Sequence, residues 1–496
     1  MLDTKKIDSY FDGKKNLSLD SSVVMPKKIS WRRVFKLGLP CLAAALLGVM
    51  VVMPNIRKNV DLRDNITIPH KNEMEKLHIE QTVFNSTDHK NRVNKIVADS
   101  VDETEPGSKL MKIVNPRGSI PTESGIADIS AQGGLFNQNN NILELTGDVT
   151  AIVDNNTEIT SPHVKYDFKK EFGWSDEPVK AKGDWGSMEA QSFEYDKNKS
   201  LLVLKGHNKI IGNGGVLSAE EQTLIYQYEN KSVSTGKASV AQNNNVMRAD
   251  KIVGYFTASG KKELVRAEAF GNVVIKTPEE TITGKEGHYN PLTGEVVLYG
   301  SLTGEKNDSG RVSIRQGNNI LYAQKITAYL AVNGKKDLQK AIAVGKVRIV
   351  TPSETAAGKE GHYNPLTGEV VLYGNYLTEA RKNGFVTIKQ GENVLKAEKI
   401  IAYLNKGGKK DLQKAVAVGN VSVTTPSGSA VGDRGVYSPQ ENKVELFDNV
   451  RIEQNGNYIE GVHAETDLVT SISRISGDEN TGGRIRGKFY KIRKSK

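Results

Sequence analysis

Apolar and polar residues alternate with a period of two along most of the chain after residue 110. The alternating runs are short, and turn-forming stretches such as NPLTG, TPSE and QGNN separate them. Alternation of this kind is typical of strands with one buried face, and closely spaced turn formers indicate hairpins. No stretch of this region carries a long helical stripe. The pattern predicts an all-β fold of antiparallel strands.

The same strand pattern returns at a fixed distance along the chain. The stretch EGHYNPLTGEVVLYG occupies 286–300 and recurs, letter for letter, 74 residues later at 360–374. A diverged third copy, GVYSPQENKVELFDN, follows at 435–449. Repeats of this length are typical of elongated architectures whose units stack on one another. Tyr195 and Gly206 already show the Tyr-to-Gly spacing of the copies, so we expect the array to begin before residue 200.

The copies indicate which strand positions face the interior. Where two copies read EVVLY the third reads KVELF, so the middle position accepts Glu445 and its flanking positions stay apolar. Alternate residues of a strand point to opposite faces, so the flanking positions are predicted to point inward and the middle one outward. The predicted inward positions, extended by the same alternation to the other strands, are Leu202, Leu204, Val273, Ile275, Val296, Leu298, Val312, Ile314, Val347, Ile349, Val370, Leu372, Val386, Ile388, Val421, Val423, Val444 and Leu446.

Composition favours an elongated shape over a compact globule. Only 37% of the 496 residues are hydrophobic and 6% are aromatic, whereas 47 are glycine. A stack of strands has a high surface-to-volume ratio and needs fewer core residues than a globule of the same length.

One segment near the N-terminus differs from the rest. Residues 37–56, LGLPCLAAALLGVMVVMPNI, carry no charge and are long enough to cross a bilayer core of roughly 30 Å as a helix. The excess of Lys and Arg before this run predicts a cytoplasmic segment at 1–36, with everything after residue 57 outside. A cleaved signal peptide is the alternative, but the run is long and no A-x-A site follows. The single cysteine, Cys41, lies inside the run, so we expect no disulfide in the exported part.

Charged residues concentrate at the two ends of the chain. Residues 57–110 are polar and poor in aromatics, and we predict that they form a tether. The segment 479–496 includes RIRGKFYKIRKSK, which is typical of a solvated basic tail, with contact to anionic lipid or phosphate as the alternative. The net charge of +10 permits nucleic-acid binding in principle. A chain outside the inner membrane has little access to nucleic acid, so we predict no such partner.

No constellation of residues points to catalysis or to a metal. His288 and His362 recur at equivalent positions, but the third copy has Val436 there, so we interpret them as solvent-facing strand residues. The lysine and glutamate before each histidine are replaced by Asp433 and Arg434, which argues against an acid–base pair. The phosphate-binding pattern G-x-x-x-x-G-K-[ST] does not occur in the sequence. The sequence predicts no enzyme activity, no metal and no cofactor.

Taken together, these segments resemble the Lpt bridge proteins, which carry lipopolysaccharide between the two membranes of Gram-negative bacteria. The stretch LELTGDVTAIVDNNTEITSPHVKYD, followed by SDEPV and GSMEAQSFEYDKNKSLLVLKG, is similar to the membrane-anchored component, LptC. The later repeats, with GGRIRGKFY near the end, are similar to its soluble, OstA-like partner, LptA. The resemblance implies an LptC-like β-jelly roll at 111–215 and LptA/OstA-like repeats at 216–478. In the family the two types are usually separate proteins.

The resemblance also implies a fold and a function. The family fold is an elongated, open β-jelly roll in which two antiparallel sheets form a V around an apolar interior. The implied function is a non-enzymatic bridge that shelters lipopolysaccharide acyl chains in a hydrophobic groove between inner and outer membrane. The implied partners are lipopolysaccharide, the periplasmic domain of an inner-membrane ABC transporter, and the outer-membrane lipopolysaccharide translocon or another copy at the C-proximal edge.

Two other functions remain open at this point. The main alternative is a membrane-anchored β-solenoid that serves as a structural or adhesive stalk, with a filled core. A membrane-tethered sensor with an output at 1–36 is the second, and the absence of a recognisable fold motif in that segment argues against it.

Overall fold

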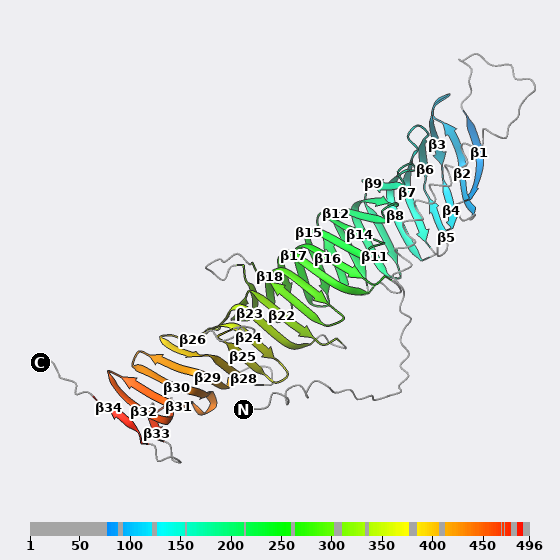
Figure 1. The fold of residues 1–496 in the computed structure, drawn as a ribbon. Helices are drawn as coiled ribbons and strands as arrows, with labels where there is room; N and C mark the ends of the chain where they lie inside the picture. The colour runs from blue at the N-terminus through cyan, green and yellow to red at the C-terminus, as the bar shows by residue number, and fades with distance from the viewer. Residues whose placement is uncertain are drawn as a thin grey trace, which may run out of the picture.

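The protein forms one elongated β-structure, with β1 and β34 at its two ends (Figure 1). The computed structural model describes residues 77–489 apart from the short segments 88–92, 122–125, 154–155, 213–214, 259–262, 302–309, 333–336, 376–383, 406–411, 468, 471 and 478–483. The 34 strands of the described residues join through antiparallel pairs into one hydrogen-bonded network. Within these residues the one helical element is a 3-10 turn, η3 (Pro439–Glu441). The predicted all-β class is confirmed.

The strands follow one another closely along the chain. The N-terminal half contains β1 (His78–Thr87), β2 (Val93–Glu103), β3 (Leu110–Val114), β4 (Arg117–Pro121), β5 (Ile126–Ser130), β6 (Gly133–Asn137), β7 (Ile142–Val153), β8 (Thr157–Asp167), β9 (Phe172–Ser175), β10 (Val179–Gly183), β11 (Gly186–Asp196), β12 (Leu201–Gly212), β13 (Gly215–Ala219), β14 (Gln222–Tyr226), β15 (Lys231–Gln242), β16 (Asn245–Phe256) and β17 (Leu264–Lys276). The C-terminal half contains β18 (Thr281–Asn290), β19 (Glu295–Tyr299), β20 (Val312–Gln316), β21 (Asn319–Ala323), β22 (Lys325–Leu330), β23 (Leu338–Val350), β24 (Thr355–Asn364), β25 (Glu369–Tyr373), β26 (Val386–Gln390), β27 (Asn393–Ala397), β28 (Lys399–Leu404), β29 (Leu412–Thr425), β30 (Gly428–Ser438), β31 (Lys443–Gln454), β32 (Asn457–Asp467), β33 (Ser473–Ser476) and β34 (Arg486–Lys488).

The strand pairing explains the 74-residue repeat. Between the long strands β18 and β23, the short strands β19 and β22 pair side by side along one half of the network. The short strands β20 and β21 fill the other half between the same two long strands. The next period repeats this arrangement with β25 and β28 on one side and β26 and β27 on the other. We call the half with β19, β22, β25 and β28 the first arm, and the half with β20, β21, β26 and β27 the second arm.

In each period one long strand, β17, β23 or β29, passes from one arm to the other through a β-bulge. In β23 the register shifts between Val344 and Val347, and the two residues between them, Gly345 and Lys346, have φ of 83° and 48°. The bulges of β17 and β29 lie 74 residues before and after, with glycine again first. A bulge with glycine in the left-handed region bends a strand and increases its twist. The line of bulges therefore forms the fold line between the two arms.

Substitution of Gly345 by alanine should destabilise the repeats. An alanine at this position would have its backbone in the left-handed region, and its Cβ would lie 2.0 Å from the Gln324 side-chain oxygen. The left-handed conformation alone costs roughly 1–2 kcal/mol for a residue with a Cβ. We expect Gly345→Ala to lower the thermal midpoint by more than Gly317→Ala, because Gly317 has a positive φ but open space around it. Equal midpoints for the two variants would contradict the role of the bulge.

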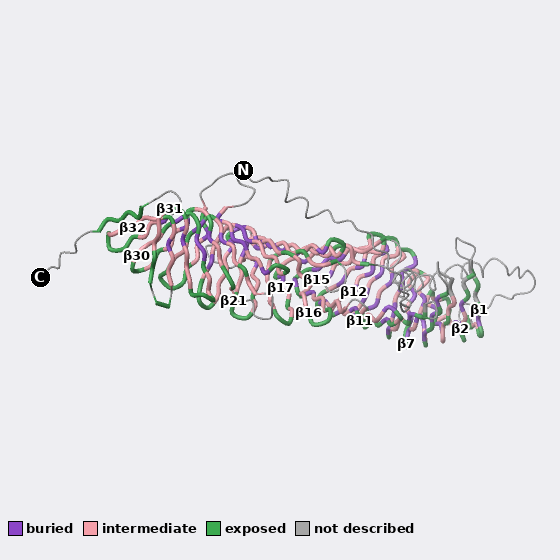
Figure 2. Tube along the Cα trace, turned by 90° about the horizontal axis from the view of Figure 1, so that it is seen from below, coloured by how far each residue is buried: buried purple, intermediate pink, exposed green. Residues whose placement is uncertain are grey.

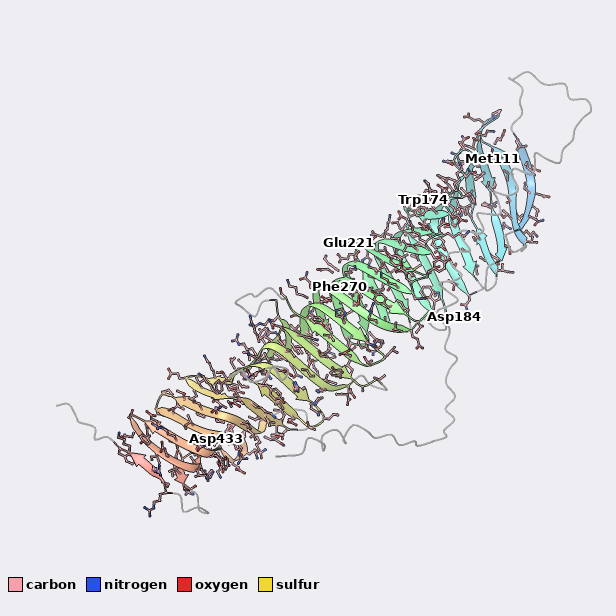
Figure 3. The ribbon with its side chains drawn as sticks, in the orientation of Figure 1. Met111, Trp174, Asp184, Glu221, Phe270 and Asp433 are labelled. Carbon is pink, nitrogen blue, oxygen red and sulfur yellow. The ribbon has the colours of Figure 1, made fainter. Side chains whose placement is uncertain are left out.

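The interior contains two clusters of buried hydrophobic residues, one after the other along the long axis (Figure 2). The first runs from Ala98 to Ile225 and the second from Ala219 to Ala464. The second cluster includes residues of both arms, so the inner faces of the arms pack against each other. Figure 3 labels Met111 and Trp174 on strands of the first part, and Phe270 and Asp433 on strands of the second.

Two predictions about the ends of the chain need correction. The predicted tether at 57–110 is wrong over its second half, because β1 and β2 lie there and pair with each other in register. Ile96, Ala98 and Val101 are buried, whereas nearby charged residues such as Lys95 and Asp99 are exposed and contribute to the polar composition of the segment. The predicted tail at 479–496 contains β34, whose exposed residues pair with Tyr458, Ile459 and Glu460 of β32.

The predicted cytoplasmic and transmembrane segments, 1–36 and 37–56, lie outside the described residues. Among the residues that are described, no helix is long and apolar enough to span a membrane.

Candidate functional site

The predicted inward residues occupy two depths of the interior. Eight of them form deep rows beside the fold line, three on the first arm and five on the second. These eight are 0–5% exposed: Val273, Leu298, Val312, Val347, Leu372, Val386, Val421 and Leu446. All eight belong to the second buried cluster. Leu202 and Leu204 are equally buried but belong to the first cluster. The other eight are partly exposed: Ile275, Val296, Ile314, Ile349, Val370, Ile388, Val423 and Val444.

The partly exposed residues lie in two continuous rows farther from the fold line. On the second arm, directly paired residues form a row that we call the second-arm rim: Ile275, Ile282, Ile314, Leu321, Ile349, Ala356, Ile388, Leu395, Val423, Ala430 and Ile452. On the first arm the corresponding row, the first-arm rim, is Tyr289, Val296, Ala328, Ala341, Tyr363, Val370, Ala402, Ala415, Tyr437 and Val444. Exposure therefore rises from the deep rows to the rims.

Glycines bring the deep rows of the two arms together. A Cβ on Gly361 would lie 3.1 Å from Leu372 of the first arm and 3.5 Å from Val347 of the second. Gly287 and Gly435, at the equivalent positions of the other copies, each lie against the equivalent leucine and valine of their own copy. The glycine of the repeated EGHY motif thus leaves room for leucine and valine to pack across the fold line. The second position of the motif serves packing rather than chemistry.

The middle position of EVVLY points outward, but it is not exposed in every copy. Val371 lies on the opposite strand face from Leu372, yet it is only 7% exposed. Its registered neighbours on the outer face are His362 and Ile401, and the Tyr373 ring lies 5.3 Å from the His362 ring. Large neighbours on the outer face cover the valine. Alternation along the sequence predicts the face on which a residue lies, but not whether neighbouring strands cover it.

The repeated histidines contact neighbouring glutamates. His288 Nε2 lies 2.6 Å from Glu286 Oε1, and His362 Nε2 lies 2.6 Å from Glu360 Oε1. Both rings also make edge-on contacts with the tyrosine of the adjacent strand. The side chains are 33% and 22% exposed, so the prediction that they face solvent is correct only in part. Within the described residues, no group of three His, Cys, Asp or Glu side chains is arranged to hold a metal ion.

Sequence reasoning missed most of the interior of the N-terminal half. There the buried residues include six large aromatic side chains, Phe136, Tyr166, Phe168, Trp185, Phe193 and Tyr195. After residue 225 no aromatic residue of the described chain is buried to this degree. The N-terminal strands have no second copy to reveal their inner face, and only the alternation in stretches such as VKYDF could have indicated it. Several rim residues, among them Ile282, Leu321 and Leu395, were also missed, although ILYA and VLKA recur 74 residues apart.

The described strands thus form two arms around a largely aliphatic interior. Family profiles then distinguish two parts of the chain. The profile described as lipopolysaccharide-assembly, LptC-related, matches residues 41–211. The profile described as LptA/(LptD N-terminal domain) LPS transport protein matches residues 303–385 and 378–471. The chain is therefore similar to LptC-related proteins first and to LptA-like proteins afterwards, and the predicted order of the two on one chain is confirmed.

Part of the chain is also similar to a solved structure. This is LptH from Pseudomonas aeruginosa, the LptA homologous periplasmic component of a lipopolysaccharide transport device. The two are 19% identical, with a TM-score of 0.23, and the match covers 28% of this chain and 95% of LptH. No curated relative matches the chain.

Proposed function

We propose that this protein is a non-enzymatic bridge for lipopolysaccharide, which shelters the acyl chains of the lipid between its two arms. The observation that carries the proposal is the pair of aliphatic rims, which run beside the buried deep rows through the whole repeat region. The LptC-related and LptA-like matches support the same function. In this proposal the arms are the two sheets of an open, V-shaped β-jelly roll.

The energetics of lipid transfer favour such a surface. Exposing an acyl chain of about twelve CH₂ groups to water costs on the order of 10 kcal/mol, at roughly 0.8 kcal/mol for each group. Lipopolysaccharide carries several such chains, so it cannot cross an aqueous compartment unaided. The rims offer Val, Ile, Leu and Ala side chains, with Tyr289, Tyr363 and Tyr437 on the first arm, and no charged residue lies among them. Because acyl chains differ little along their length, a repeated aliphatic lining is sufficient and sharp specificity is not required.

We also propose domain limits for the chain. Residues 37–56 are the proposed inner-membrane anchor, residues 1–36 are the proposed cytoplasmic segment, and the remainder is periplasmic. The LptC-like part, predicted at 111–215, is extended to include β1 and β2, and the LptA-like repeats follow from 216. The energy for movement is assigned to an inner-membrane ABC transporter, since no nucleotide-binding pattern occurs in the chain.

The ends of the sheet are the proposed docking sites for partners. At the N-proximal end, β2 is the one strand among the described residues that pairs with β1, and we propose that the other edge of β1 accepts a strand. At the C-proximal end β33 and β34 pair with β32. Unpaired strand edges are sites of strand addition. We assign the first edge to the periplasmic domain of the transporter and the second to the outer-membrane translocon or to another copy.

A membrane-anchored stalk is the second candidate, and it makes a different prediction about lipid. A stalk has a filled interior along its whole length and retains no lipid. We expect the full chain, purified from its native membranes in mild detergent, to retain lipopolysaccharide that immunoblotting and mass spectrometry detect. A bound lipid amount no higher than that on an unrelated single-pass membrane protein would favour the stalk.

A further inference from the structure

The first-arm rim continues into the N-terminal half, where its character changes. Direct strand pairs link Met111, Phe136, Leu143, Tyr166, Gly173, Tyr195, Leu202 and Ile225, and this row then leads through Ser232, Gly254 and Ala267 to Tyr289. From Met111 to Ile225 the side chains of this row are 1–8% exposed. The positions that correspond to a partly exposed rim in the repeats are thus filled and closed here.

Aromatic rings account for this closure. Tyr166 lies 5.1 Å from Phe168 and Phe136 lies 6.0 Å from Phe168, measured between ring centroids, and both pairs pack edge to face. Gly173 leaves room for the cluster, since a Cβ there would lie 3.2 Å from the Tyr166 ring. Edge-to-face packing stabilises aromatic pairs beyond the area that they bury. Without lipid, these rings occupy the space between the arms.

One polar atom in this packing has no partner. The hydroxyl of Tyr166 is buried and makes no hydrogen bond, and the residue as a whole is 1% exposed. A buried tyrosine hydroxyl normally finds a partner, because an unsatisfied donor loses its bond to water without compensation. Burial also raises the pKa of this hydroxyl, so it stays protonated and remains a donor. A phenylalanine would fill the same space without the cost.

We propose that Tyr166 is a lipid-binding residue, whose hydroxyl donates a hydrogen bond to an oxygen atom of an acyl chain when lipid enters the LptC-like part. The oxygen is an ester or amide carbonyl, or a chain hydroxyl, near the polar end of the acyl chain. The aromatic cluster of Phe136, Tyr166 and Phe168 is the closed state of this section, and lipid separates the rings. The proposal rests on the proposed function, and it adds a hydrogen-bonding position within the LptC-like part.

The test compares Tyr166→Phe with the wild type, both as the full chain in detergent micelles. The probe is purified lipopolysaccharide. The control variant is Tyr195→Phe, because Tyr195 belongs to the same buried row but its hydroxyl is not among the buried atoms without a hydrogen-bond partner. Loss of one hydrogen bond should weaken lipopolysaccharide binding by roughly threefold to tenfold. The thermal midpoint of Tyr166→Phe without lipid should equal or exceed that of the wild type. Tyr195→Phe should bind lipopolysaccharide as the wild type does.

Each outcome decides one part of the proposal. Unchanged lipopolysaccharide affinity in Tyr166→Phe would remove Tyr166 from the lipid path, and a lower midpoint without lipid would mean that the hydroxyl has a partner within the protein. A photo-crosslinker at Ile349, in the repeats, reports on the proposed function independently. If Ile349 captures lipopolysaccharide and Tyr166→Phe has no effect, only the inference about Tyr166 fails. If neither part of the chain binds lipopolysaccharide, the proposed function fails as well.

Discussion

Replacing Ile349 or Leu372 by aspartate is expected to stop lipopolysaccharide transport. Ile349 lies in the second-arm rim, and Leu372 lies in the deep row of the first arm. A carboxylate among acyl chains has no counter-charge, and burying it costs several kcal/mol, which corresponds to a loss on the order of a hundredfold or more. In a strain depleted of the wild-type protein, either variant should fail to restore growth and outer-membrane lipopolysaccharide, as measured by fractionation and immunoblotting.

The two variants separate a blocked path from an unfolded protein. Leu372 is 5% exposed, so Leu372→Asp also destabilises the local packing, whereas Ile349 is partly exposed and its aspartate can stay hydrated in the free protein. Ile349→Asp should therefore retain the β-rich circular dichroism of the wild type. The control is Val297→Glu, since the third copy already has Glu445 at the equivalent outward position. Normal transport in Ile349→Asp would contradict the rim assignment, and so would loss of transport in folded Val297→Glu.

Removing one repeat is expected to abolish transport without unfolding the protein. Deletion of 301–374 joins Gly300 to Asn375, and the identical stretches at 286–300 and 360–374 make the new junction native in sequence. One period contributes four strands to each arm, counting the halves of the long strands, which is roughly 19 Å at about 4.8 Å for each strand. The shortened chain should fold, retain lipopolysaccharide on purification and fail to deliver it to the outer membrane.

The matched control for the deletion is an insertion. A second copy of 301–374, placed after Gly374, lengthens the sheet by the same amount and again creates native junctions. If length is the decisive property, this variant should support growth. Full transport by the deletion variant would mean that the number of repeats in one chain does not set the span of the bridge.

The accuracy of sequence reasoning depended on how many copies a strand has. In the repeats, three copies differ at outward positions and agree at inward ones, so alternation and comparison together predicted that Leu298, Leu372 and Leu446 point inward, and the structure buries all three. Alternation alone could not separate deep from rim positions. That difference depends on distance from the fold line, which glycine bulges such as Gly345 create within strands that the sequence presents as continuous.

The parts that were missed lack either a copy or a clear pattern. The buried rings of Phe136, Tyr166 and Phe168 belong to strands without a repeat, where an aromatic residue could face either side. In β2 the few buried residues are Ile96, Ala98 and Val101, and exposed charged residues such as Lys95 and Asp99 make the strand polar in composition. Val371 shows a further limit, because its burial depends on outer-face neighbours from two adjacent strands.

Site-specific photo-crosslinking in living cells tests the central claim most directly. A photo-crosslinking amino acid is placed at Ile349 or Val296, one in each rim, and at Val297 on the outer face of the first arm. Crosslinked products are then probed for lipopolysaccharide by immunoblotting. The proposed bridge predicts lipopolysaccharide adducts at Ile349 and Val296 and none at Val297. Equal labelling at all three positions, or labelling at Val297 alone, would contradict a lipid path between the arms.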